Sequence, residues 1–308
     1  MKATPTEFSF NHAGTAVRLS LPLDDHIATV IQTTGEFYEL DLLTALAPLL
    51  KSDDLVLDVG ANIGNHTVFF ALIVGCKVIS FEPHPDCLVH LEKSVRLNEV
   101  SERVTIRPVA VGSESGKATI IEPREKNLGM TRISQSSSGD VRVVRLDDEN
   151  IGGRVSLLKV DTEGMESEVI SGSKDIINND RPIIVAEANE IDQFVSILNS
   201  LGDLQYAPLS VYCATPTYVF LPIGTDAEKS TFNTAASRQI ISIQRQIRQL
   251  REMERHRKIA TEKLANRISA IEKKLVQIRS IEAVQNHLIA RVQELSCEVA
   301  GTSPALTD

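Results

Sequence analysis

The feature of the sequence that most constrains the fold is a short apolar segment followed by a turn with two glycines. Residues 55–59 read LVLDV, and residues 60–67 read GANIGNHT. A run of Leu and Val that ends at a glycine is typical of a strand buried on both faces, as in a parallel sheet. Apolar side chains then recur at helical spacing over residues 63–74. The stretch therefore predicts a strand–turn–helix unit.

A second apolar segment with an acidic end follows this unit. Gly60 and Gly64 permit positive φ angles and a close approach of another group to the backbone. The first N–H groups of the helix that follows favour an anion or a polar ligand. The apolar residues 78–81 end at Glu82, where an α/β protein places the acid that holds the hydroxyls of a ribose. We therefore expect the turn and Glu82 to bind a nucleoside-containing ligand.

Two alternative roles for the turn have to be weighed. Gly and Asn also occur in tight turns that bind no ligand. An NAD(P)-dependent oxidoreductase usually carries a third glycine in this turn and a hydride-transfer group such as Tyr-x-x-x-Lys, and the sequence has neither. The pattern Asp-x-Gly-Ala-Asn-x-Gly is instead similar to the loop that binds S-adenosylmethionine (SAM) in Rossmann-like methyltransferases.

Composition argues against several classes of protein. The 308 residues carry a net charge of −9, which disfavours a general nucleic-acid binder. The longest apolar run, at residues 68–76, is far shorter than the ~18 residues of a membrane-spanning helix, and the first residues show no signal-peptide pattern. Cys76, Cys87, Cys213 and Cys297 have no metal-binding spacing. We therefore expect a cytoplasmic protein with reduced thiols and no transmembrane segment.

Strand-like segments alternate with helical segments over residues 50–225, which predicts a doubly wound α/β fold. Residues 8–32 alternate polar and apolar side chains and predict a β hairpin or cap before the main sheet. The polar, serine-containing segment 122–140 is expected to be a loop or a lid over the ligand site. We assign residues 1–50 to an N-terminal β/helical cap and residues 51–225 to the main domain.

The tail differs in character from the rest of the chain. Between residues 234 and 299 there is no Pro or Gly, and apolar residues recur at steps of three and four. This spacing predicts a long coiled-coil helix over residues 235–300, followed by a disordered end at 301–308. The seam consists of Ile240, Ile243, Ile247, Leu250, Leu264, Ile268, Ile271, Leu275, Ile278, Leu288, Val292, Leu295 and Val299.

The chain resembles the FkbM-type methyltransferase family in several blocks. The Lys-x-Asp-x-Glu-Gly-x-Glu pattern that begins at Lys159 is the most distinguishing feature. The resemblance implies a Rossmann-like sheet and a SAM-dependent O-methyltransferase that acts on sugars, glycans or polyketide-type hydroxyls. The coiled-coil tail lies outside the resemblance. The matching blocks are DVGANIGNHT at residues 58–67, FEPHPDC at 81–87, LLKVDTEGMESEVISG at 157–172 and, more weakly, RPIIVAE at 181–187 and GEFYE at 35–39.

The resemblance also implies which residues hold the cofactor. Residues of the turn would cradle the amino-acid end of SAM, and Glu82 would bind the ribose hydroxyls. His84 would lie near the adenine edge, and residues 109–112 would form a wall against the adenine. The implied turn residues are Asp58, Gly60, Ala61, Asn62, Gly64 and Asn65.

Acidic residues that follow two further strands are candidates for the chemistry. A hydroxyl is a weak nucleophile, so a general base beside it favours methyl transfer. Asp161 follows the strand-like residues 155–160, at the edge where α/β sheets bind ligands, and is our first candidate for the base. Its alternative role is to cap the next helix. The other candidates are Glu163, which is able to cap that helix or bind the SAM ammonium, Glu187, and His66, for which a structural hydrogen bond is the alternative.

Other polar residues receive no functional assignment. Asp161, Glu187 and Asn189 are able in principle to hold a divalent cation through oxygen ligands. Two acids and an amide at scattered positions are common by chance, so we predict no metal. The remaining histidines are expected at the surface: His12, His26, His90, His256 and His287.

The expected partners are a small-molecule or glycan acceptor and a second copy of the chain, joined through the coiled coil. Contact of the tail with a membrane and docking onto a second enzyme of a glycan pathway are alternatives. A further alternative is a coiled-coil scaffold whose SAM-binding domain is catalytically inactive. No nucleic-acid partner is expected.

Overall fold

The computed structural model describes residues 6–23, 25–121, 132–136, 139–256, 269–281, 284–286 and 290–291. The chain divides into two compact units. The first comprises Met1–Gln205 and Tyr212–Tyr218, and the second comprises Tyr206–Val211 and Val219–Asp308.

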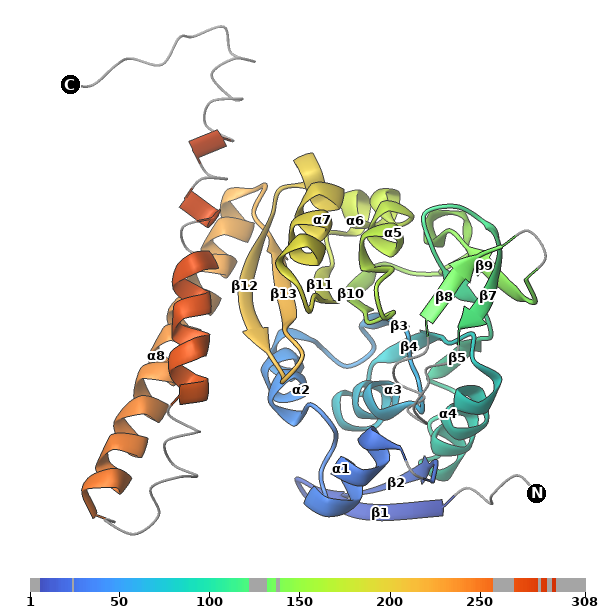
Figure 1. The fold of residues 1–308 in the computed structure, drawn as a ribbon, viewed down its shortest axis with the longest axis horizontal. Helices are drawn as coiled ribbons and strands as arrows, with labels where there is room; N and C mark the ends of the chain where they lie inside the picture. The colour runs from blue at the N-terminus through green and yellow to red at the C-terminus, as the bar shows by residue number, and fades with distance from the viewer. Residues whose placement is uncertain are drawn as a thin grey trace, which may run out of the picture. The chain divides into compact units, whose positions relative to one another are not determined.

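The first unit is built on a sheet of parallel strands (Figure 1), as the sequence predicts. The strand order of the whole sheet is β12-β13-β11-β10-β3-β4-β5. The order changes direction between β3 and β10, and this switch point is where open α/β sheets bind ligands. The strands of the first unit are β3 (Leu55–Val59), β4 (Lys77–Phe81), β5 (Val104–Arg107), β10 (Val155–Val160) and β11 (Ile183–Glu187). Most residues of β12 (Tyr206–Tyr212) and β13 (Thr217–Pro222) belong to the second unit.

The predicted strand–turn–helix unit is confirmed. Strand β3 is followed by the glycine turn, by helix α3 (Asn65–Val68) and by a π-helical segment, Phe69–Val74. Gly64 has a φ angle of 87°, and a Cβ atom there would lie 2.6 Å from Cδ1 of Leu91 on helix α4 (Pro85–Leu97). The left-handed φ angle and the close packing of the turn on α4 therefore favour a glycine at this position.

The other helices of the first unit connect the strands. Short 3₁₀ helices lie at Ala47–Leu49, Leu146–Asp148 and Gly202–Leu204. The α-helices are α1 (His26–Thr34), α2 (Leu40–Leu46), α5 (Glu166–Ser171), α6 (Lys174–Asp180) and α7 (Ile191–Leu201).

The N-terminal segment is a β hairpin followed by a helix. The antiparallel strands β1 (Thr6–His12) and β2 (Thr15–Leu21) match the predicted hairpin. The expectation of a β pattern as far as residue 32 was wrong, because Asp25 caps helix α1 by accepting a 3.0 Å hydrogen bond from the amide of Ala28. The hairpin packs on α4, where Nδ1 of His90 lies 3.0 Å from Oγ of Ser20. His90 is therefore buried rather than at the surface.

A small second sheet has the order β6-β9-β7-β8. Strand β8 lies within the segment predicted to be a loop, so that prediction was wrong over residues 132–135. Residues 122–131 and 137–138 of the segment lie outside the described residues, and its role as a lid stays a prediction. The strands are β6 (Ala110–Val111), β7 (Gly116–Ile121), β8 (Arg132–Gln135) and β9 (Val141–Val144).

The second unit contains helix α8 (Asp226–His256) and a further helical stretch at residues 269–281. Figure 1 shows the two stretches side by side, and Ile240, Ile278 and Ile281 line one small cavity between them. The prediction of one long helix is therefore corrected, because part of the apolar seam packs within the chain itself. The seam positions at 264, 268, 288, 292, 295 and 299 lie outside the described residues, as does the 301–308 end.

Helix α8 is the longest helix in the described ranges, yet neither it nor any other helix there combines the length and the apolar character that crossing a membrane requires.

Candidate active site

A cavity of about 330 Å³ lies in the first unit at the carboxyl ends of the parallel strands. Val59 and Phe81 line it at the ends of β3 and β4, Asp161 lines it just after β10, and Glu187 lines it at the end of β11. This is the edge of the sheet that the acid-terminated strands predict. The segment 109–111 forms a further part of the wall.

The turn after β3 and the end of β4 are joined by Glu82. Its Oε2 accepts a 2.8 Å hydrogen bond from the amide of Asn62, and its Oε1 accepts a 2.8 Å hydrogen bond from the amide of His84. Burial raises the pKa of Glu82 to about 7, although both backbone donors act in the opposite direction. Gly60, Asn62 and Glu82 all line the cavity, so the structure brings these predicted cofactor residues together.

The other predicted cofactor residues are not among the lining residues. The amide side chain of Asn65 makes two 3.0 Å hydrogen bonds with the backbone of Tyr38. Nδ1 of His84 accepts a hydrogen bond from the amide of Asp86 and caps α4. The side-chain amide of Asn65 and Nδ1 of His84 both bond to the protein itself, which supports a positioning role for these two groups. Ala61 and Gly64 also do not line the cavity. The amide of Gly64 donates a 2.9 Å hydrogen bond to the carbonyl of Ala61, which closes the turn.

Asp58 lies beneath the turn and is fully buried. Its Oδ2 accepts a 2.6 Å hydrogen bond from Oγ1 of Thr67. Its Oδ1 lies 3.2 Å from Nζ of Lys159, which is also buried. Asp58 therefore supports the turn through an internal ion pair, and it does not reach the cavity.

The turn approaches the end of β10 very closely. Gly60 has a φ angle of 76°, and a Cβ atom at this position would collide with the backbone carbonyl of Asp161. Only glycine permits both the backbone conformation and the approach. The predicted cofactor turn and the predicted base are consequently in direct backbone contact.

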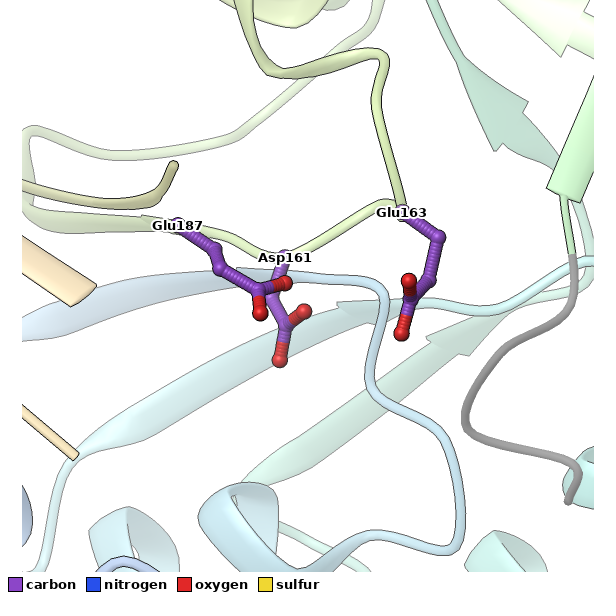
Figure 2. A group of neighbouring side chains, drawn as sticks. All are labelled: Asp161, Glu163 and Glu187. Atoms are coloured by element: carbon purple, nitrogen blue, oxygen red, sulfur yellow. The ribbon is translucent and has the colours of Figure 1, made fainter. Parts of the chain in front are cut away.

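Three carboxyl groups gather at the same side of the cavity. Figure 2 shows Asp161 and Glu187 with their carboxyl groups turned toward one another and Glu163 beside them. An oxygen of each lies within 4.8 Å of the others. All three line the cavity, so the structure brings together the three predicted catalytic acids.

Asp161 and Glu187 have different protonation states. Burial and the nearby Asp161 carboxylate raise the pKa of Glu187 to about 9. Burial alone would raise the pKa of Asp161 as well, but the Lys159 ammonium and a hydrogen bond with Glu187 lower it below its ordinary value. Near neutral pH, Asp161 is therefore ionised while Glu187 holds a proton.

His66, the fourth predicted catalytic residue, lies behind the cavity wall. It is buried on α3, and its Nε2 lies 3.3 Å from Oε2 of Glu39 without hydrogen-bond geometry. It is not among the lining residues, whereas Glu39 is. The geometry supports the structural alternative for His66. His26 is exposed, as the sequence predicts, and it also lines the cavity.

The three acids are also a candidate group for a divalent ion. The ammonium of Lys159 already lies 3.3 Å from Oδ2 of Asp161, and a second cation on this carboxylate would be repelled by it. Asn189 lines the cavity, and its Nδ2 lies 3.4 Å from Oε1 of Glu187. We therefore do not assign these residues as metal ligands.

Sequence reasoning missed Tyr38 and Glu39, which line the cavity, and Lys159, which lies behind Asp161. A signal for Lys159 was present, because a lysine within the apolar strand VSLLKV is unusual unless its charge is paired. Tyr38 and Glu39 reach the cavity from the segment before α2, and Asn65 holds that segment in place. The sequence feature that pointed to Tyr38 and Glu39 was the GEFYE block at residues 35–39.

Two curated relatives are methyltransferases. The chain is 29% identical over 180 residues to hexuronic acid methyltransferase AglP of Haloferax volcanii, which covers 56% of this chain and 71% of the relative. It is 27% identical over 159 residues to methyltransferase sdnD of Sordaria araneosa, covering 40% of this chain and 61% of that protein.

A solved structure of methyltransferase FkbM from Methylobacillus flagellatus matches 55% of this chain and 43% of its own length. The TM-score is 0.43 and the identity is 17%.

The family model of the methyltransferase FkbM domain matches residues 58–208, which include the glycine turn, Glu82 and the Asp161–Glu187 pair. The domain accounts for the parallel sheet, for the cavity at its carboxyl edge and for SAM as the cofactor. Residues 58–208, about half of the chain, are therefore a methyltransferase domain of the FkbM family, with SAM as the cofactor.

Proposed function

We propose that the protein transfers a methyl group from SAM to a hydroxyl of a sugar, a glycan or a related natural product. The observation that carries this proposal is the position of Asp161, an ionised carboxylate in the cavity wall whose backbone touches the glycine turn. A base beside the cofactor turn suits an acceptor that must lose a proton. The names of the relatives AglP and sdnD support a methyltransferase, and that of AglP supports a sugar-type acceptor.

The proposed cofactor site uses residues on the β3 and β4 side of the cavity. The turn at Gly60 and Asn62 would hold the amino-acid end of SAM through its backbone. Glu82 would accept hydrogen bonds from the ribose hydroxyls. Val109, Ala110 and Val111, which line the cavity, would pack against the adenine. The apolar side chains and the single carboxylate fit a ligand with one flat ring and one diol.

The proposed acceptor site lies on the β10 and β11 side. Bound SAM supplies an electrophilic methyl group on a positively charged sulfur. Asp161 would accept the hydroxyl proton of the acceptor as the oxygen–methyl bond forms and the sulfur–methyl bond breaks, leaving S-adenosylhomocysteine. Glu187, which holds a proton near neutral pH, would donate it in a hydrogen bond to Asp161 and so orient that carboxylate toward the acceptor. Alignment of the acceptor oxygen supplies much of the rate.

Transfer of labelled methyl groups tests the proposal. The purified chain is incubated with methyl-tritiated SAM and a panel of neutral glycosides, together with a glycoside of a hexuronic acid. We expect the label in a product that resists mild alkali, because a methyl ether is stable where a methyl ester is cleaved. An alkali-labile product would mean that the acceptor atom is a carboxylate oxygen.

The competing proposal is a scaffold that binds SAM without turnover. Its signature is a folded protein that binds SAM but labels no acceptor in the panel. Labelling of any acceptor excludes the scaffold as the whole function.

We further propose that the chain self-associates through its C-terminal helices, with a second enzyme of a glycan pathway as the alternative partner. Ile241 and Val276 are large apolar residues left exposed on these helices, at 53% and 66% exposure. Light scattering of the full chain and of Ile241→Glu tests this, and a monomeric mass for both would exclude self-association. The cytoplasmic location stays a prediction from sequence.

A further inference from the structure

We propose that Lys159 is a positioning residue that ties the cofactor turn to the acceptor base Asp161. The inference rests on the proposed function for the roles of the glycine turn and of Asp161. The contacts of Lys159 with both come from the structure itself. Lys159 is not among the residues that line the cavity, so it acts through its neighbours and does not touch the reacting atoms.

The ammonium of Lys159 has three partners on three segments. Nζ donates a 2.8 Å hydrogen bond to the backbone carbonyl of Gly60 in the turn. It lies 3.2 Å from Oδ1 of Asp58 on β3 and 3.3 Å from Oδ2 of Asp161 after β10. The contact with Gly60 is a hydrogen bond, and the two contacts with the carboxylates are ion pairs, so one cation links all three segments.

The register of the sheet creates this arrangement. Lys159 is the direct neighbour of Asp58 in the parallel β10–β3 pair. Side chains two residues apart on a strand point to the same face, so a side chain two positions after Lys159 is directed toward the same region. That residue is Asp161. A single slip in register would turn Lys159 to the opposite face and separate the three groups.

The charge of Lys159 affects the ionisation of Asp161, the proposed base, because little water screens it. The Lys159 side chain is 5% exposed and that of Asp58 is fully buried, so water contributes little to screening this pair. Asp161 is 35% exposed and opens into the cavity. The ammonium therefore favours an ionised Asp161 from the interior of the protein, while the Asp161 carboxylate remains accessible from the cavity.

Other titratable groups face this cluster. Glu187 favours an ionised Asp161 through its hydrogen bond, as Lys159 does through its charge. Glu187, Glu39, Tyr38 and Cys213 interact with Asp161 or with Lys159, and Glu163 interacts with Glu187. His66 is the other group whose positive charge would favour an ionised Asp161. In the described part of the cluster, Lys159 is therefore the permanent cation that holds the base in its reactive form.

The test measures the ionisation of Asp161 and the affinity for SAM in the full chain. Carboxyl ¹³C NMR of aspartate-labelled protein follows the titration, and an Asp161→Asn spectrum assigns the signal. In Lys159→Met we expect the Asp161 midpoint to rise by about one to three pH units, because the opposite charge is lost. We also expect SAM affinity to fall by at least about tenfold, because the Gly60 carbonyl loses its charged donor. Lys174→Met, at an exposed lysine on α6, is the matched control.

A second variant protects the test against misfolding of Lys159→Met. Asp58→Asn keeps an oxygen for Thr67 but removes the competing carboxylate, so Asp161 would be the one carboxylate paired with the Lys159 ammonium. We expect the Asp161 midpoint to move to lower pH in this variant, opposite to the change in Lys159→Met.

The proposal is overturned if the Asp161 midpoint is the same in the wild type and in a folded Lys159→Met, even if SAM affinity falls. It is also overturned if Asp58→Asn leaves the midpoint unchanged. A wild-type chain that fails to bind SAM would instead contradict the proposed function, because the NMR titration needs neither SAM nor an acceptor.

Discussion

The backbone amide of Asn62 donates a 2.8 Å hydrogen bond to Oε2 of Glu82. This contact joins the turn after β3 to the end of β4, which are the two segments that the proposed cofactor site requires. Glu82 is buried, so its charge state responds to its surroundings more than that of a surface glutamate does.

Affinity for SAM should depend on pH through Glu82. Burial raises the pKa of Glu82 to about 7, so the carboxylate becomes protonated as the pH falls below this value. A protonated carboxyl group is a poorer acceptor for two ribose hydroxyls. We expect calorimetric titration to show weaker SAM binding at pH 6 than at pH 8 in the wild type. Glu82→Gln should bind SAM weakly at both values, and an equally strong pH dependence in this variant would exclude Glu82 as its source.

Gly60→Ala should destabilise the fold more than a substitution with backbone strain alone. An alanine in the left-handed region costs about 1–2 kcal/mol, and at Gly60 its Cβ would also collide with the carbonyl of Asp161. Gly152→Ala is the matched control, because Gly152 has a φ angle of 72° against 76° for Gly60 but has no atom within 4 Å of the added Cβ. Denaturant unfolding should show the larger loss for Gly60→Ala. Equal losses would mean that the turn is free to move away from β10.

Asn65→Ala should lower stability by about 1–3 kcal/mol, because it leaves two backbone groups of Tyr38 without partners. Asn11→Ala removes the one hydrogen bond that Oδ1 of Asn11 accepts from the amide of Gly14 in an exposed turn, and it should cost less. Urea unfolding of the two variants compares them. A smaller loss for Asn65→Ala than for Asn11→Ala would show that the Tyr38 segment does not depend on this amide.

Stability should fall as the pH rises from 5 to 8, partly because of Glu187. Its pKa is raised from 4.5 to about 9 by burial and by Asp161, so the folded state holds a proton that the unfolded state has lost across this window. One such group contributes a slope of roughly −1.4 kcal/mol per pH unit to the free energy of unfolding. Glu82 contributes with the same sign up to about pH 7.

Glu187→Gln should therefore make the decline in stability shallower, whereas Glu102→Gln, at an exposed site, should leave it as in the wild type. The measurement is the free energy of unfolding in urea at each pH. An unchanged slope in Glu187→Gln would show that Glu187 is ionised in the folded protein.

The parallel sheet and the edge that carries the site were predictable because apolar runs end at Asp161, Glu187 and Glu82. The register between the strands was not predictable from the sequence, and the pairing of Lys159 with Asp58 depends on that register. The direction of the Asn65 side chain was equally hidden, because a turn residue is able to face a ligand or the protein. Helix α1 was missed although Asp25 and Gly35 cap its two ends, since alternating polarity outweighed the cap signals.

The most direct test of the account compares the wild type with Asp161→Asn on one accepted substrate, with SAM affinity measured on the same samples. Asn keeps the size of the side chain and removes the base. We predict that SAM affinity stays close to the wild-type value while kcat falls by roughly 10²–10⁴-fold, the usual contribution of a general base. Methyl transfer at the wild-type rate by Asp161→Asn would contradict the assignment of Asp161 as the base.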